Sequence, residues 1–378
     1  MQRIEFNVKD VLPQLAQVSS VVAQKNAVPI LGCVKFETKE VGGNTFLKLT
    51  ASDGETWIST IANVKGDDGI VTCINAVDIL KGLQNLDDAN VVLEIDTEKG
   101  NVVCKYGKGF FRITCEPADG FPIHKIDKGN LNEFMLPAKS LLAYTKKVAF
   151  ATNADELRPV LNSIHFDFFN DHMVIVATDG QRLAKVSDDT IQHTLDGKKS
   201  LSLPTKPSTI LTNVLASTDD DVKCKFDDKV VVFSNQYFNL STRLIEGNYP
   251  NYEMVIPKDG LHVAKINKNA IISAIKRVAP MGSTISELMT LTFGNNEILV
   301  KTENLELSKK AEETIACEYN DAEMTIGFKG SYLLQGLQSV QTDNILLHVI
   351  SSDRACVIKP DVEDGWEYLC LIMPLRID

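Results

Sequence analysis

The sequence has little of what marks a membrane or secreted protein. Its apolar runs, such as residues 345–347, are far shorter than the ~18 apolar residues that a membrane-spanning helix needs. The first residues, MQRIE, lack the apolar stretch of a signal peptide. The 8 cysteines are scattered, and none forms a C-x-x-C pair, so we interpret them as small buried side chains in a reducing compartment. These absences predict a cytoplasmic protein with no membrane partner.

Signatures of catalysis and of cofactor binding are also missing. No P-loop, H-E-x-x-H, G-x-S-x-G or complete G-x-G-x-x-G occurs, and the 6 histidines show no metal-ligand spacing. Asp53 and Asp179 are conceivable as an acid/base pair. Both stand in turn motifs at equivalent positions of a repeat, however, which favours a role in the turn. We therefore expect no cofactor, no metal and no enzymatic activity, and turnover that depends on these two aspartates is the remote alternative.

What the sequence does contain is an internal repeat. The 378 residues include 44% hydrophobic and 24% charged residues, a composition typical of globular domains. Amphipathic helices are predicted within residues 6–25, 136–152 and 266–282. In the first of them Pro13 is compatible with an opening helical turn if Asp10 caps the helix. Strands and a second, shorter helix follow each of these helices in the same order, so one unit recurs at intervals of about 130 residues.

The connections between the predicted strands are as short as hairpins. This predicts an α+β unit with mostly antiparallel strands. Polar stretches near Gly129 and Gly260 mark the boundaries between units. Three units of one kind predict a quasi-symmetric assembly in which each contacts the next in the same way. The predicted domains are residues 1–129, 130–259 and 260–378.

The charge is distributed unevenly over these units. A net charge of −11 argues against a protein that grips nucleic acid tightly. The six predicted helices nevertheless carry ten net positive charges, none of them is net acidic, and the other residues carry twenty-one net negative charges. Ordinary solvated helix faces are one interpretation. The other is a surface of helices that faces a polyanion through loose phosphate contacts, which read no bases and allow sliding.

Four segments together resemble the β sliding clamp, the beta subunit of bacterial DNA polymerase III. They are residues 177–184 (ATDGQRLA), 28–32 (VPILG), 246–250 (EGNYP) and 373–376 (MPLR), and the resemblance extends over the whole chain. It implies three tandem copies of the DNA-clamp fold in a ring-shaped, head-to-tail homodimer around double-stranded DNA, with helices inside and antiparallel sheets outside. Such a processivity factor is non-catalytic. It tethers the polymerase III catalytic subunit, the clamp loader and other proteins that carry a clamp-binding motif.

The resemblance also implies a peptide-binding pocket between the second and third domains. A largely apolar pocket with a few polar groups suits a hydrophobic peptide anchor. A last edge strand packed for stability is the other interpretation of residues 372–375. Gln181 stands where many members have His, Met254 where some have Arg, and the tail runs on to Asp378, so the peptide preference stays open. The residues assigned to the pocket are Leu161, Thr178, Gly180, Gln181, Arg182, Leu183, Pro250, Val255, Tyr332, Ile372, Met373, Pro374, Leu375 and Arg376.

Two further sets follow from the resemblance and from the charge distribution. The residues expected to face DNA are Lys25, Lys139, Lys146, Lys147, Arg158, Lys276 and Arg277. At the dimer seam, Phe111 and Ile113 of the first domain are expected to meet apolar residues of the third domain in a second copy. Those residues are Val278, Met281 and Ile285. The alternative to a clamp is a repeat-built protein-interaction scaffold that never encircles DNA.

Overall fold

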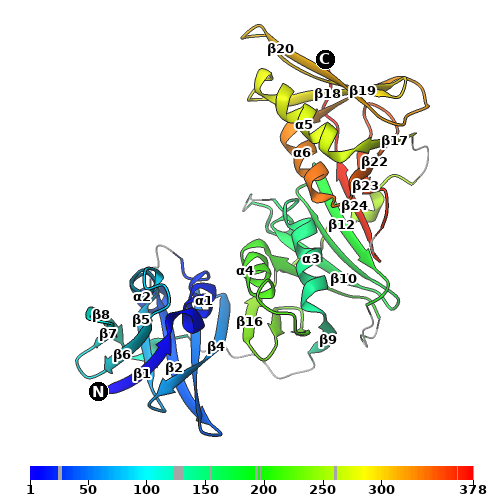
Figure 1. The fold of residues 1–378 in the computed structure, drawn as a ribbon. Coiled ribbons are helices and arrows are strands. Elements are labelled where there is room, and N and C mark those ends of the chain that lie inside the picture. Colours follow the sequence, from blue (N-terminus) through cyan, green and yellow to red (C-terminus); the bar gives the residue numbers. More distant parts are fainter. Residues whose placement is uncertain are drawn as a thin grey trace. The chain divides into compact units, whose positions relative to one another are not determined.

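The computed structural model describes the chain except for residues 24–27, 123–130, 154, 156, 192–194, 196, 259–261, 364 and 378. The chain divides into two compact units (Figure 1). Unit 1 contains residues 1–142 and 206–244, and unit 2 contains residues 143–205 and 245–378. Both predicted domain boundaries lie in or beside stretches that are outside the described residues.

Unit 1 is built on a twelve-stranded sheet in the order β1-β6-β7-β8-β5-β2-β3-β4-β16-β15-β14-β9. Its helices are α1 (Val8–Ser19) and α2 (Ala76–Gln84). Its strands are β1 (Gln2–Asn7), β2 (Cys33–Val41), β3 (Asn44–Ser52), β4 (Thr56–Gly66), β5 (Val71–Asn75), β6 (Asn90–Asp96), β7 (Asn101–Tyr106), β8 (Gly109–Glu116), β9 (Asn132–Leu136), β14 (Val222–Phe226), β15 (Val230–Ser234) and β16 (Phe238–Arg243).

The first helix shows how the sequence sets an element boundary. α1 begins at Val8 because Asn7 caps it, and Asn7 Oδ1 accepts the N–H of Lys9 at 3.0 Å. The prediction that Asp10 is the cap is wrong, and Pro13 lies inside the helix. A Pro there removes one intrahelical hydrogen bond. The buried stripe of Val8, Val11, Leu15 and Val18 holds the helix against the sheet all the same.

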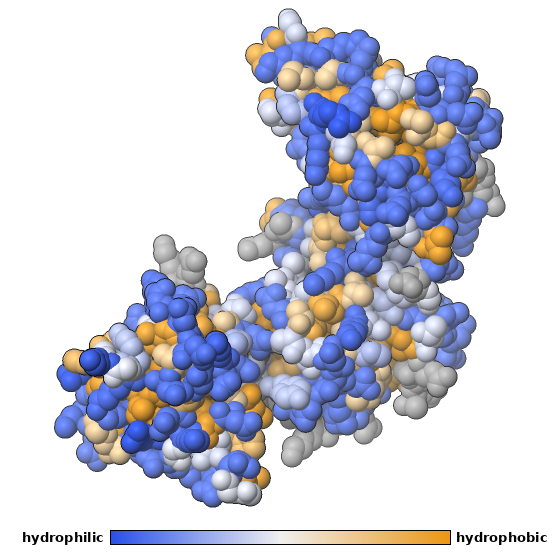
Figure 2. Space-filling model, viewed as in Figure 1, coloured by the Kyte–Doolittle hydropathy of each residue, from blue (hydrophilic) through white to orange (hydrophobic). Residues whose placement is uncertain are grey.

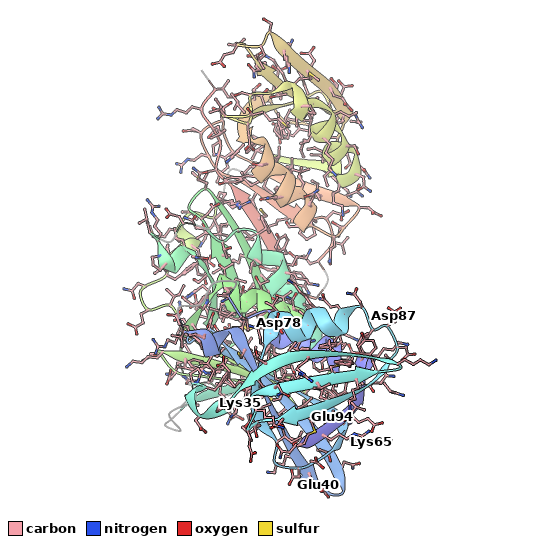
Figure 3. All side chains as sticks on the ribbon, turned by 90° about the vertical axis from the view of Figure 1, so that its left-hand side faces the viewer. Lys35, Glu40, Lys65, Asp78, Asp87 and Glu94 are labelled. Atoms are coloured by element: carbon pink, nitrogen blue, oxygen red, sulfur yellow. The ribbon has the colours of Figure 1, made fainter. Side chains whose placement is uncertain are left out.

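Charged side chains cover the outside of unit 1. Lys35, Lys65 and Glu94 project from its strands, whereas Asp78 and Asp87 come from α2 and from the turn that follows it (Figure 3). Several strand residues pair across the sheet surface, as Lys105 does with Glu94 at 2.5 Å. On the face drawn in Figure 2, hydrophilic residues predominate and apolar residues appear in small groups between them. The sheet therefore presents a hydrated, mixed-charge surface.

Unit 2 contains an eight-stranded sheet, β13-β10-β11-β12-β24-β23-β22-β17, and a four-stranded sheet, β20-β19-β18-β21. The helices α5 (Lys268–Val278) and α6 (Gly330–Ser339) belong to it. The helix α3 (Ala138–Ala149) begins in unit 1 and ends in unit 2, and α4 (Thr205–Leu215) begins in unit 2 and ends in unit 1. Its strands are β10 (Ser163–Phe168), β11 (Met173–Thr178), β12 (Arg182–Asp188), β13 (Lys199–Pro204), β17 (His262–Asn267), β18 (Leu288–Gly294), β19 (Glu297–Asn304), β20 (Lys309–Ala316), β21 (Met324–Lys329), β22 (Asn344–Val349), β23 (Cys356–Pro360) and β24 (Glu367–Ile372).

The two units share one construction rule. Each third of the chain supplies two groups of four strands, and every pairing between named strands is antiparallel, which confirms the predicted α+β class. The last strand of the second group in one repeat pairs with the last strand of the first group in the next repeat. In unit 1 this joins β4 to β16, with Ile58 opposite Leu240. In unit 2 it joins β12 to β24, with Ala184 opposite Cys370.

Candidate functional site

The segment that carries the resemblance most strongly forms a closed turn between β11 and β12. Asp179 Oδ1 accepts the N–H groups of Gln181 and Arg182, each at 2.9 Å. Thr178 Oγ1 donates to the carbonyl of Arg182 at 2.6 Å, and Gly180 adopts a φ of +90°, which glycine alone takes without strain. Asp53 plays the same part in the first repeat, because its Oδ1 accepts the N–H of Thr56 at 2.8 Å. Both aspartates are turn residues, as predicted.

Arg182 links this turn to α6 in the third repeat. Its Nε donates to Asp179 Oδ2 at 3.0 Å and its Nη1 donates to Gln335 Oε1. Its guanidinium carbon lies 4.2 Å from the ring centre of Tyr332, a cation–π contact. Only 11% of the Arg182 side chain is exposed, so most of it is committed to joining the second and third repeats.

The C-terminal tail continues past β24 along the same turn. The N–H of Met373 donates to the carbonyl of Gln181 at 2.8 Å, and that of Leu375 donates to the carbonyl of Gly327 at 2.8 Å. Met373 is 42% exposed. The side chain of Ile372 points the other way, into the core below α6, where a Cβ on Gly336 would lie 3.0 Å from it. Ile372 is therefore a core residue and does not belong to an exposed peptide surface.

Residues 249–256 lie over the face of the eight-stranded sheet that is opposite α6. Tyr252 is buried there in an apolar cluster with Leu183, Leu371 and neighbouring valines, and Tyr249 and Ile256 pack against that cluster. Leu183 is consequently only 2% exposed and supports the surface from below. Val255, at 51%, and Met254, at 80%, are exposed on the same segment.

The structure therefore brings most of the predicted pocket residues to one junction, in two roles. We name the exposed set the tail–turn surface, and it consists of Gly180, Gln181, Pro250, Met254, Val255, Met373 and Arg376. Leu161, Thr178 and Leu183 lie underneath, each less than 9% exposed. Arg182, Tyr332, Pro374 and Leu375 are half-buried between the two sets.

Lys147 contradicts its predicted place on an open basic face. It is 7% exposed, and its amine donates to the carbonyl of Ser339. Its Nζ lies 5.1 Å from the ring centre of Tyr368 and 5.9 Å from that of Trp366. Burial, assisted by the charge of Lys268, lowers the pKa of Lys147 from 10.5 to about 8. The reason is that strand β24 of the next repeat covers this side of α3.

The other basic candidates are mostly exposed. Lys146 stands at a groove of about 370 Å³ between α3 and α6, whose walls carry Gln335, Gln338 and Gln341. Lys139 pairs with Asp219 at 3.2 Å, and the side chains of both are largely exposed. Arg158 and Lys276 are exposed, and Arg277 forms a bidentate ion pair with Glu313. Lys25 lies outside the described residues.

The predicted seam residues also differ in how far they are exposed. Phe111 is half-buried and packs on α2 so closely that a Cβ on Gly82 would lie 2.4 Å from its ring. Ile113 is also half-buried, and Met281 and Ile285 are 40% and 90% exposed. Val278 is 2% exposed within its own repeat and cannot reach a second copy.

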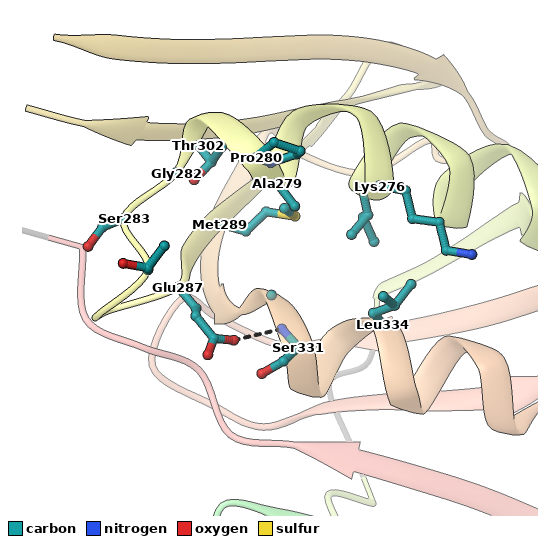
Figure 4. Close-up of a pocket in the computed structure, with 13 residues that line it drawn as sticks. Lys276, Ala279, Pro280, Gly282, Ser283, Glu287, Met289, Thr302, Ser331 and Leu334 are labelled. Carbon is teal, nitrogen blue, oxygen red and sulfur yellow. Dashed lines mark hydrogen bonds between the residues drawn. The ribbon is translucent and has the colours of Figure 1, made fainter. Parts of the chain in front are cut away.

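A separate cavity of about 440 Å³ lies between α5 and α6, near Met281 (Figure 4). Glu287 caps α6 there, since its carboxylate accepts the N–H of Ser331 at 3.3 Å. Among the described residues, no group of three or more His, Cys, Asp or Glu side chains is placed to hold a metal ion. None of the described helices combines the length and the apolar character needed to cross a membrane.

Comparison with known proteins decides between the two interpretations of the repeat. Three models of the DNA polymerase III beta subunit match the chain: the N-terminal domain at residues 3–126, the central domain at 135–251 and the C-terminal domain at 253–376. The chain belongs to the β sliding clamp family. The clamp of Pseudomonas aeruginosa is 26% identical over 372 residues, which cover 97% of each chain.

Solved clamps share the fold of the whole chain. A P. aeruginosa clamp bound to griselimycin has a TM-score of 0.91 at 23% identity, and one from Bartonella birtlesii bound to griselimycin has a TM-score of 0.91 at 25% identity. Each comparison covers 100% of both chains. This clamp thus consists of three tandem DNA-clamp domains, and like its family it is not an enzyme.

Sequence reasoning missed several residues that shape the tail–turn surface of the clamp. His165 and Asp167 on β10 contact Tyr249 and Tyr252 directly. The two tyrosines flank Pro250 in the sequence, which is a signal for an anchored segment. Nothing in the sequence of β10 pairs it with that segment, because the contact joins residues about 85 positions apart.

Proposed function

We infer that this protein is a DNA sliding clamp, a processivity factor that acts as a closed homodimer. The observation that carries the inference is the way in which consecutive repeats pair their strands. This pairing joins β4 to β16 and β12 to β24. Among the described strands it leaves the outer edge of β20 unpaired, and β8 pairs with β5 only at Cys115 and Glu116, so that residues 109–114 of β8 also offer an open edge. Unpaired edges invite another strand. If separate copies pair in the way that consecutive repeats do, β20 of one copy pairs with β8 of a second copy. Two copies then pair both of their open edges, head to tail.

The rule also gives a register for this seam. Thr60 faces Phe238 at the first junction and Val186 faces Tyr368 at the second. On β20 the equivalent inward residue is Glu313, and on β8 it is Phe111. We therefore propose that Glu313 faces Phe111 of the second copy, that Ala311 faces Ile113, and that Glu312 faces Arg112 across the exposed side. The last pair joins opposite charges, which favours this register.

The helices at the seam support the same arrangement. Gln17, Lys147 and Arg277 occupy equivalent positions on α1, α3 and α5. Gln17 donates to Ser217 Oγ at 2.8 Å just after α4, and Lys147 donates to the carbonyl of Ser339 at the end of α6. Arg277 then points to the residues after α2 in the second copy, where Asp87 is exposed.

For DNA we propose loose contacts from the helices. The groove beside Lys146 offers an ammonium group and the side-chain amides of three glutamines. These groups donate to phosphate oxygens without reading bases. Lys139, Arg158 and Lys276 extend this basic set, whereas Arg277, which was expected to face DNA, pairs with Glu313 and is assigned to the seam. The amine of Lys147 is excluded because it is buried.

For protein partners we propose the tail–turn surface. Its exposed apolar side chains lie beside the half-buried Arg182 and Tyr332, and such a surface suits the binding of a short hydrophobic peptide. The polymerase III catalytic subunit, the clamp loader and other proteins with a clamp-binding motif are the partners that the family implies. Two solved clamps are bound to griselimycin, and we propose that this compound binds the tail–turn surface here and can serve as its probe. We also propose that the protein acts in the cytoplasm.

A disulfide test addresses the seam. Arg112→Cys combined with Glu312→Cys places two thiols at facing positions, where Cα atoms of paired strands lie about 4.5–5.5 Å apart, within disulfide reach. We expect a covalent dimer on a non-reducing gel. The control, Arg112→Cys with Thr314→Cys, shifts one thiol by two residues and should cross-link poorly. Equal cross-linking of both pairs, or of neither, would contradict the register.

A topological test addresses the function. Clamps loaded onto circular plasmid should stay bound through gel filtration and slide off once the plasmid is linearised. Equal loss from both forms would refute encirclement. Lys146→Glu combined with Lys276→Glu distinguishes the scaffold, because a scaffold should keep its partners and lose nothing on DNA, whereas a clamp should lose loading or processivity.

A further inference from the structure

A cluster of buried polar side chains lies beneath residues 249–255, and no role proposed above uses it. His165 and Asp167 stand two residues apart on β10 and therefore face the same side of the sheet. They are 7% and 2% exposed. His165 Nδ1 lies 2.9 Å from Ser202 Oγ, and its Nε2 lies 3.3 Å from Asp167 Oδ1. Burying such polar groups costs free energy unless they form hydrogen bonds or ion pairs with one another.

The segment above supplies the other half of the cluster. The ring of Tyr249 stacks on His165, with the centroids 4.3 Å apart and the planes 6° from parallel. The hydroxyl of Tyr252 donates to Asp167 Oδ2 at 2.7 Å. Because Tyr249 and Tyr252 flank Pro250, both ends of this short stretch are tied to β10. Glu253, the next residue, pairs with Lys185 on β12.

The order Ser202, His165, Asp167 resembles a hydrolytic triad, but the surroundings argue against that use. Ser202 is 5% exposed, and Tyr249 covers the face of the imidazole ring. A nucleophile needs space beside it for the reacting carbonyl. The cluster therefore fits an anchor for the segment above it better than a reactive centre.

The charge state of Asp167 suits an anchor. Burial alone would raise the pKa of Asp167, but the nearby imidazole of His165 and the hydrogen bond from Tyr252 outweigh burial and hold that pKa below its ordinary value. Lys198 adds an ion pair at 3.3 Å. Burial and the same carboxylate raise the pKa of Tyr252, so its hydroxyl stays a donor. Hydrogen bonds to a charged acceptor are the stronger kind.

We propose that Asp167, together with His165, is a positioning residue that presets the tail–turn surface. It holds residues 249–255, before any peptide binds, in the conformation that the peptide recognises. Pro250 and Val255 are thereby kept in position on the tail–turn surface. The proposal rests on the function proposed for that surface. Replacing the carboxylate by an amide removes its charge and one of its two acceptor oxygens, so the Tyr252 hydroxyl and the imidazole no longer both face a charged acceptor. The segment then moves to recover partners, and binding has to restore its order first, which lowers affinity.

Isothermal titration of the full-length protein with griselimycin tests this. Asp167→Asn should weaken binding tenfold or more. The matched control is Asp171→Asn, an exposed aspartate on the same hairpin whose side chain contacts His172. It should bind like the wild type. Tyr252→Phe removes the donating hydroxyl and should also weaken binding. If Asp167 acts through Tyr252, the double variant should bind no more than twofold worse than Asp167→Asn.

Hydrogen exchange on the free protein gives the second readout. In Asp167→Asn the amides of residues 249–255 should exchange faster, while those of β11 and β12 keep their protection. Wild-type affinity in Asp167→Asn, losses that multiply in the double variant, or exchange that rises throughout unit 2 would each overturn the proposal. Failure of the wild type to bind griselimycin would instead count against the peptide function, and the exchange result would still decide whether Asp167 anchors the segment.

Discussion

Replacing Lys147 by methionine should stabilise unit 2 at neutral pH. Methionine keeps an apolar chain of similar length under Trp366 and Tyr368, and it removes a buried charge. A pKa lowered from 10.5 to about 8 means that the folded protein holds this proton less well than the unfolded chain does. The corresponding penalty at pH 7 is about 3 kcal/mol. Lost cation–π contacts and the lost bond to Ser339 offset part of it, so we expect a net gain of about 1–2 kcal/mol.

The sign of the pH dependence makes this prediction specific. Between pH 8 and 10.5 the unfolded chain keeps the proton and the folded protein releases it, so the wild type gains stability as the pH rises. From pH 7 to pH 9.5 the penalty shrinks by about 2 kcal/mol. The advantage of Lys147→Met over the wild type should therefore be largest at pH 7 and should vanish or reverse by pH 9.5.

Urea unfolding followed by tryptophan fluorescence measures this change. The chain has 2 tryptophans, and a Trp57→Phe background leaves Trp366, beside Lys147, as the reporter. Lys146→Met, at the exposed neighbour, is the control and should show no pH-dependent difference from the wild type. A loss of stability in Lys147→Met at pH 7, or the same difference at both pH values, would refute the reasoning.

Three other changes test the packing and the seam. Gly82→Ala would put a Cβ 2.4 Å from the Phe111 ring, so the ring should move and the dimer dissociation constant should rise at least tenfold by sedimentation, with little change in unit 1. Gly66→Ala would place a Cβ 2.2 Å from the carbonyl oxygen of Arg3 at a φ of +145°, and should lower the unfolding free energy of unit 1, read from Trp57, by about 2 kcal/mol or more. Raising the salt from 50 to 500 mM shortens the screening length severalfold and should weaken the dimer, less so in Arg277→Gln; an unchanged salt dependence in that variant would argue against a seam role for Arg277.

The repeat and the strand class were predictable because they depend on local patterns. Apolar spacing placed α1, α3 and α5 correctly, and short connections predicted antiparallel strands. The start of α1 was predicted wrongly because Asn7 and Asp10 are both good caps. The choice depends on where β1 ends, since Asn7 is also the last residue of that strand. Sequence spacing alone does not contain that information.

The site was harder because its residues take their roles from another repeat. Lys146 and Lys147 are adjacent and chemically identical and both border the groove, yet Lys146 is exposed and Lys147 is buried against Trp366 and Tyr368. Ile372, the last residue of β24, and Met373, which follows it, are adjacent too, and only Met373 is exposed. Alternation predicts that they differ, but not which of them faces the core. His165 and Asp167 became interpretable only once Tyr249 and Tyr252 were placed above them.

The equivalent positions 17, 147 and 277 explain how one helix position serves both the two junctions within the chain and the proposed seam between chains. Glutamine and buried lysine bridge to the next repeat within the chain, where a covalent connection keeps the partners together and a neutral or desolvated group suffices. Arginine at the third position is exposed and holds Glu313 on its own domain. A seam between separate chains has to stay soluble when it is open and has to recognise its partner when it closes. A permanently charged group, paired internally in one state and available to Asp87 of a second copy in the other, meets both demands.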